Sequence, residues 1–103
     1  MSDEYLIKLP AGGGQLLMDT LRSSTMASTA SEDCLMLRDP AIESGWHYSM
    51  RIFKQSEHCL FMELAMPSYP LFLLLETALL ASEHAIVEYD DDEPITLARV
   101  FRV

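Results

Sequence analysis

This chain of 103 residues has few basic residues, few cysteines and no long apolar segment. Lysine and arginine together number 7, against 16 aspartates and glutamates, and the formal net charge is −9 at pH 7. Nucleic-acid affinity comes largely from Lys and Arg that displace counterions from phosphates, so this charge disfavours direct DNA or RNA binding. A basic protein partner fits the charge better, because complementary fields raise association rates. Surplus acid can also serve solubility alone.

The two cysteines do not suggest a disulfide framework. Cys34 and Cys59 each lie in an apolar run, where a reduced thiol behaves as a small hydrophobe. The N-terminal MSDEYLIKLP lacks the basic start and apolar core of a signal peptide. The apolar stretch 71–81 is too short to span a bilayer. The sequence therefore predicts a cytoplasmic protein with no membrane association.

The composition is that of a folded domain. Half of the residues are hydrophobic and only 22% are charged, unlike a disordered segment. No repeat or linker divides the chain, so we expect a single domain over residues 1–103. The order of patterns predicts β-α-β-β-β-α-β-β. This is an α+β fold, with one mostly antiparallel sheet of about five or six strands and two helices packed on it.

Apolar periodicity and turn residues place the individual elements. We expect strands over 4–9, 34–37, 46–53, 58–65, 85–89 and 95–103. One helix is expected from Gln15 onward, and a second over 71–84 with Ser68 as its cap and Pro70 in its first turn. The Ser- and Thr-rich stretch 23–33 reads as a polar loop or a fraying helix end.

The strands 46–53 and 58–65 are expected to form a hairpin. If Gln55 and Ser56 form its turn, Lys54 lies opposite Glu57 as a cross-strand charge pair. One face of the hairpin then holds Trp46, Tyr48, Met50, Ile52, Cys59, Phe61 and Ala65. The other face holds His47, Ser49, Arg51, His58, Leu60, Met62 and Leu64.

No catalytic or metal-binding motif is visible. Gly12 to Gly14 precede a helix but lack the following Lys of a P-loop, so a plain strand-to-helix turn is favoured over a phosphate site. The Cys and His residues show no zinc-site spacing. No nucleophile motif accompanies the serines. We therefore expect no enzyme activity, no cofactor and no metal, with an unrecognised catalytic site as a less favoured alternative.

The segment EYDDDEP, residues 88–94, concentrates the negative charge. It lacks the glycine and the spaced closing Glu of a calcium loop. It can be a solvated turn between two strands, or a contact for a basic partner that relieves the repulsion between adjacent carboxylates. The candidate partner-binding residues are Glu88, Tyr89, Asp90, Asp91, Asp92 and Glu93.

In size, acidity, the cluster at residues 90–93 and the lack of a catalytic motif, the chain resembles the immunity proteins of bacterial polymorphic-toxin and contact-dependent inhibition systems. The resemblance implies a tight complex with a cognate toxin domain, often a basic nuclease, whose active site is blocked by acidic contacts. It extends to no family motif. The alternative is a homodimeric ligand-binding or scaffold domain that uses the apolar helix 71–81 as its interface.

Overall fold

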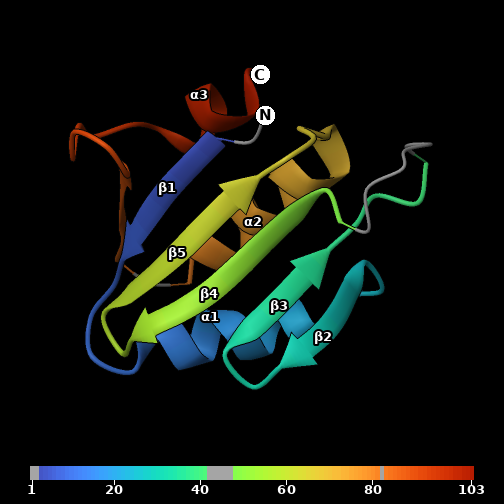
Figure 1. The fold of residues 1–103 in the computed structure, drawn as a ribbon, viewed down its shortest axis with the longest axis horizontal. Coiled ribbons are helices and arrows are strands. Elements are labelled where there is room, and N and C mark those ends of the chain that lie inside the picture. Colours follow the sequence, from blue (N-terminus) through green and yellow to red (C-terminus); the bar gives the residue numbers. More distant parts are fainter. Residues whose placement is uncertain (1–2, 42–47, 82) are drawn as a thin grey trace.

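The computed structural model describes residues 3–41, 48–81 and 83–103. Within these ranges, six strands form one antiparallel sheet in the order β2-β3-β4-β5-β1-β6 (Figure 1). The strands are β1 (Asp3–Lys8), β2 (Ala27–Ser31), β3 (Cys34–Leu37), β4 (Met50–Ser56), β5 (Cys59–Leu64) and β6 (Ala85–Glu88). The helices are α1 (Gly13–Arg22), α2 (Tyr69–Leu79) and α3 (Leu97–Phe101). The α+β fold with a single antiparallel sheet is therefore confirmed.

The helices α1 and α2 lie side by side on one face of the sheet (Figure 1). Alternate residues along each strand point toward them, as the pleat of a strand requires. The buried strand residues on this face are Tyr5, Ile7, Leu35, Leu37, Met50, Ile52, Leu60, Met62, Leu64 and Ile86. The helices complete the core with Leu17, Met18, Leu21, Leu71, Leu75 and Leu79. Burial of this apolar set is the main force that holds the helices to the sheet.

The hairpin of β4 and β5 forms, but the expected register is wrong. Lys54 lies opposite Leu60 instead of Glu57, and the strand β4 continues to Ser56 with a register shift between Lys54 and Ser56. When the pairing of two strands is displaced by an odd number of residues, each face of one strand is matched with the opposite face of the other. Met50 and Ile52 therefore share the buried face with the leucines of β5. The observed register is favoured because it brings the apolar residues of both strands under the helices.

The start of this hairpin also differs from expectation. Trp46 and His47 lie outside the described residues. Tyr48 precedes β4, and its hydroxyl reaches Glu63 at 2.6 Å, on the face opposite Met50. The chain therefore does not continue a regular strand alternation between residues 48 and 50.

Two segments contradict the sequence-based assignment. Residues 27–31, expected as part of a polar loop or a fraying helix end, form the edge strand β2 against β3. Small polar residues on an edge leave no apolar alternation to detect. Residues 95–103, expected as a strand, contain α3, where the Thr96 hydroxyl caps the helix by accepting from the Arg99 backbone N–H at 3.2 Å. In place of the expected strand pairing, β6 forms an isolated antiparallel β-bridge between Val87 and Pro94.

The predicted cap of the second helix is confirmed, but the helix begins at Tyr69, two residues before the predicted range, and is shorter than predicted. Ser68 is the cap, and its hydroxyl accepts from the Leu71 backbone N–H at 3.2 Å. The helix ends at Leu79 rather than at residue 84. Within the described ranges, no helix is both long and apolar enough to cross a membrane.

Candidate partner-binding surface

The six predicted partner-binding residues, 88–93, lie together at the end of β6 and in the tight turn that follows it, and we call this segment the acidic turn. The Glu88 backbone N–H donates to the Glu93 carbonyl at 2.9 Å, and the Asp92 N–H donates to the Glu88 carbonyl at 3.0 Å. The Asp91 carboxylate accepts from the Glu93 N–H at 3.2 Å. Asp92 has a φ of 61°, a left-handed conformation that Asp tolerates better than most residues. Asp91 and Asp92 therefore stabilise the backbone conformation of the turn in addition to contributing negative charge.

The acidic turn is anchored to the sheet across β1. The Tyr89 backbone N–H donates to the Glu4 carbonyl at 3.2 Å. The Tyr89 ring meets the Phe61 ring of β5 edge to face, with centroids 5.1 Å apart. Lys8 Nζ and Asp92 Oδ1 are 3.5 Å apart. These three contacts hold the turn at the border of the sheet face that carries Lys8 and Phe61.

Beside the acidic turn lies a partly enclosed hollow of about 430 Å³. Its lining consists of two tyrosines and five carboxylates: Asp3, Glu4, Tyr5, Glu88, Tyr89, Asp90 and Asp91. Two of these carboxylates, Asp3 and Glu4, come from the start of β1, because β1 pairs with β6 and opposes Tyr5 to Glu88. The pairing of β1 with β6 thus places two carboxylates that are distant in the sequence beside the acidic turn.

The crowding of like charges changes the acidity of one group in this hollow. The negative charge of Asp91 raises the pKa of Glu88 above its usual value, and partial desolvation and a hydrogen bond with Asp91 act in the same direction. Arg99 opposes the shift. The fold therefore holds carboxylates closer together than their charges favour, and added positive charge would relieve the repulsion.

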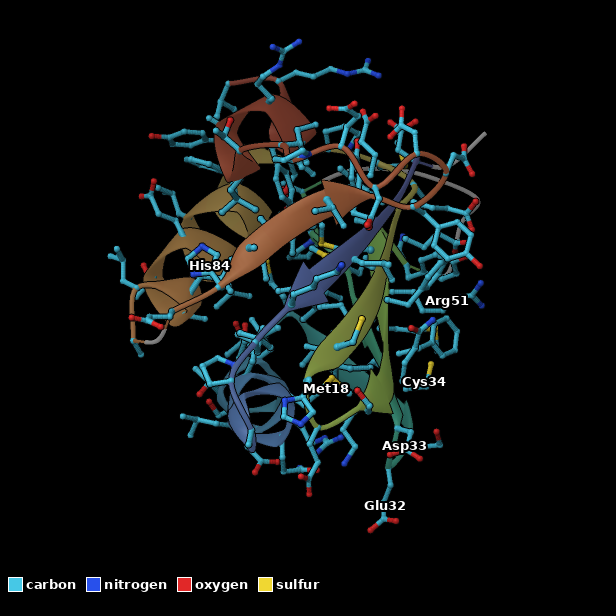
Figure 2. The ribbon with its side chains drawn as sticks, turned by 90° about the vertical axis from the view of Figure 1, so that its left-hand side faces the viewer. Met18, Glu32, Asp33, Cys34, Arg51 and His84 are labelled. Atoms are coloured by element: carbon cyan, nitrogen blue, oxygen red, sulfur yellow. The ribbon has the colours of Figure 1, made fainter. Side chains whose placement is uncertain are left out.

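The sheet face opposite α1 and α2, here called the open face, is the second part of the surface. None of the three helices in the described ranges lies over it, and Figure 2 shows Arg51 and Cys34 projecting on this side, away from the helices. Phe53 and Phe61 are neighbours on it, with ring centroids 6.0 Å apart. The aromatic contact of Tyr89 joins this pair to the acidic turn.

A cation is held within the open face. The Arg51 guanidinium lies 4.8 Å from the centroid of Tyr48 and 4.9 Å from that of Phe53. Its Nη2 is 2.9 Å from Glu63 Oε1, the atom to which the Tyr48 hydroxyl also donates. Arg51 and Glu63 are direct cross-strand partners. The expected hairpin does not predict this cluster, because it places Tyr48 and Arg51 on opposite faces.

The two cysteines lie on separate strands of the sheet. Cys34 and Cys59 are free and half-buried, on β3 and β5 with β4 between them, and burial raises the pKa of each thiol. A raised pKa disfavours the nucleophilic thiolate. In the part of the chain that the structure describes, no cluster of three or more His, Cys, Asp or Glu could hold a metal ion.

The glycine segment before α1 has a packing role. Gly12 has a φ of 78° and begins the helix as its N-terminal cap residue. The Gly14 backbone N–H donates to the Glu57 carbonyl at 3.2 Å, and a Cβ at Gly14 would lie 3.2 Å from the Ser56 carbonyl oxygen. The glycine lets the helix start approach the β4–β5 turn closely.

A scan against protein-family models and searches of curated proteins and of solved structures gave no match to this chain. The function of this protein is therefore inferred from the acidic turn, the hollow beside it and the open face.

Proposed function

We propose that this protein is an immunity protein that binds a basic toxin domain, such as a nuclease, and blocks its active site. The contact is made through the acidic turn, residues 88–93, and the neighbouring carboxylates of β1. The proposal includes no catalytic reaction, cofactor or metal. A cytoplasmic location follows from the same proposal, since the toxin would act there.

The main support is the convergence of five carboxylates on one partly enclosed hollow. The negative charge of Asp91 raises the pKa of Glu88, so the repulsion between these two carboxylates is not fully relieved within the chain. A surface that presents lysines or arginines would relieve it and gain charge-assisted hydrogen bonds. Nuclease active sites bind phosphates with such cations, so an acidic turn can occupy the place of the nucleic-acid backbone.

The rigidity of the turn favours tight binding. Backbone hydrogen bonds within the turn and to Glu4 fix the position of its side chains before any partner binds. Preorganised groups lose less conformational entropy on association. Tyr89 is exposed and belongs to a residue type that is enriched among strongly contributing interface residues.

The direct test uses the basic domain that this proposal expects to be encoded beside this chain. We expect the purified domain to bind and to lose its toxic activity in the complex. The double variant Asp90→Asn/Glu93→Gln is expected to slow association by about tenfold at low salt, with a smaller effect at high salt. The variant leaves in place Asp91 and Asp92, which support the turn.

The matched control is Glu76→Gln/Glu83→Gln, which removes the same charge at exposed positions on and after α2. It is expected to leave the association rate within about twofold of the original. Equal effects of the two double variants would show that only net charge matters. Absence of binding to the neighbouring basic domain would refute the proposal.

A homodimer remains the second candidate, and a specific feature of α2 favours it. Tyr69, Leu73 and Leu80 are 60%, 41% and 80% exposed. Their spacing places them on one line along the helix. Glu76 lies in the same row, and Thr77 and Ala81 are further exposed positions of the predicted interface 71–81. Light scattering tests it, because a monomer at high protein concentration rules the dimer out.

A further inference from the structure

We propose that the open face of the sheet forms the centre of the partner contact, and that its occupant is a segment with an apolar side chain flanked by lysines or arginines. This inference rests on the proposed binding of a basic protein and specifies the kind of segment that would bind. The acidic turn then forms one border of the contact rather than the whole of it.

The first observation is an apolar row that crosses the sheet. Leu6 of β1 lies opposite Phe61 of β5, Phe61 lies opposite Phe53 of β4, and Phe53 lies opposite Cys34 of β3. The side chains of directly opposed residues project on the same face and touch. The row therefore continues across four strands without a charged residue.

This row differs from what a solvated sheet face normally shows. An antiparallel sheet that packs helices on one side usually carries polar residues on the other. Here the members of the row are half-buried, and the ring of Tyr89 packs edge to face against Phe61. A contiguous apolar strip of this kind, bordered by charge, is typical of a surface that another molecule covers.

The second observation is the charge around the row. The adjoining cross-strand row runs from Glu4 through Glu63 to Arg51. The acidic turn borders the β6 side. Arg51 is paired with Glu63 at 2.9 Å, and Lys8 on the same face is paired with Asp92 at 3.5 Å. Arg51 and Lys8 are therefore each already neutralised by a carboxylate, and the acidic turn leaves a surplus of negative charge at the border.

These two observations select one occupant. The apolar row accepts an apolar side chain, and the acidic border favours cations on either side of it. A second copy of this chain fits poorly, because each copy has a net charge of −9 and would bring its own carboxylates to the border. An acidic or neutral segment would leave the border carboxylates desolvated without partners.

The experiment compares two synthetic pentapeptides of equal charge. In one, tryptophan is flanked by two lysines on each side, and in the other, serine replaces the tryptophan. Each is titrated into the isotope-labelled full chain while backbone and aromatic NMR signals are recorded. We expect both peptides to shift the acidic turn. The tryptophan peptide is also expected to shift Leu6, Phe53 and Phe61 and to bind about tenfold more tightly.

Two variants assign this preference to the open face. Phe61→Leu preserves an apolar side chain but removes the ring, and we expect it to reduce the preference for tryptophan by about threefold or more. Phe61→Ala is expected to remove more of it, provided that its NMR spectrum shows an intact fold. The control Leu80→Ala, at the exposed cap position directly after α2, is expected to leave the preference unchanged.

The outcomes separate this inference from the proposed function. Equal affinities with shifts confined to the acidic turn would overturn the role of the open face and leave acidic recognition intact. Shifts along α2 with the tryptophan peptide would also overturn it and would support the exposed line of that helix as the binding surface. If neither peptide binds at low salt, recognition of basic segments fails as a whole.

Discussion

The pairing of Arg51 with Glu63 provides a quantitative test of the open face. Arg51 Nη2 lies 2.9 Å from Glu63 Oε1, and the two side chains are 33% and 14% exposed. The substitution Glu63→Gln preserves the shape and an acceptor oxygen for the Tyr48 hydroxyl. It removes the negative charge that balances the guanidinium between two aromatic rings. We expect this loss to destabilise the folded state.

The exposures determine the magnitude. A pair on the surface contributes about 0.2–1 kcal/mol, whereas breaking a fully buried pair costs about 3–5 kcal/mol. The Arg51–Glu63 pair lies between these limits, and its hydrogen bond is charge-assisted. We therefore expect Glu63→Gln to lower the free energy of unfolding by about 1–2 kcal/mol. For a domain of this size, each kcal/mol corresponds to a fall in Tm of about 4–8 °C.

Urea denaturation of a double-mutant cycle isolates the interaction. We expect a coupling energy of about 1 kcal/mol between Glu63→Gln and Arg51→Met. The matched control is the cycle of Lys8→Met and Asp92→Asn. That pair is 3.5 Å apart with side chains 49% and 66% exposed, so its coupling is expected to stay below about 0.5 kcal/mol. A coupling at Arg51–Glu63 no larger than at Lys8–Asp92 would refute the reasoning.

Three other perturbations have defined outcomes. The hydrogen bond to Glu63 raises the pKa of Tyr48, so the folded state binds the hydroxyl proton more tightly than the unfolded state does. The free energy of unfolding therefore falls as pH rises from about 10 through the raised pKa. Tyr48→Phe is expected to reduce this fall, measured by urea denaturation at several pH values. The negative charge of Asp91 raises the pKa of Glu88, so the favourable effect of its proton is lost as pH rises through that pKa. At about pH 7, Glu88→Gln is therefore expected to raise Tm at low salt, with a smaller gain in about 1 M NaCl. Met62 is fully buried in the core. Met62→Ala is expected to lower the free energy of unfolding by about 2–5 kcal/mol, measured by urea denaturation. A loss below about 1 kcal/mol would contradict the place of Met62 in the core.

Local patterns were sufficient for much of the fold. The first strand, β3 and the start of α2 follow from short apolar runs that end at Pro or begin at a Ser cap. These signals act within a few residues and need no knowledge of distant partners. The two wrong segments, β2 and α3, lack such signals. Small polar residues take the strand conformation only because β3 pairs with them, and the last residues form a helix because Val100 and Phe101 are buried there.

The candidate surface divides in the same way. The acidic turn was visible as consecutive carboxylates, and the structure places all six predicted residues in one turn. The contribution of Asp3 and Glu4 was not visible, because it depends on the pairing of β1 with β6. The open face was missed altogether, because the assumed hairpin register assigned Arg51 and Phe61 to different faces.

The sequence by itself determined the net charge, the α+β class and the position of the acidic turn, since each depends on composition or on neighbours along the chain. Only the tertiary structure decided which side chains share a face. A strand alternates its side chains at every residue, so a change of register by an odd number reverses which faces of two strands coincide. The covering of one face by α1 and α2 selects the register that buries Met50, Ile52 and the leucines of β5. The same choice leaves Phe53, Phe61 and Arg51 together on the other face.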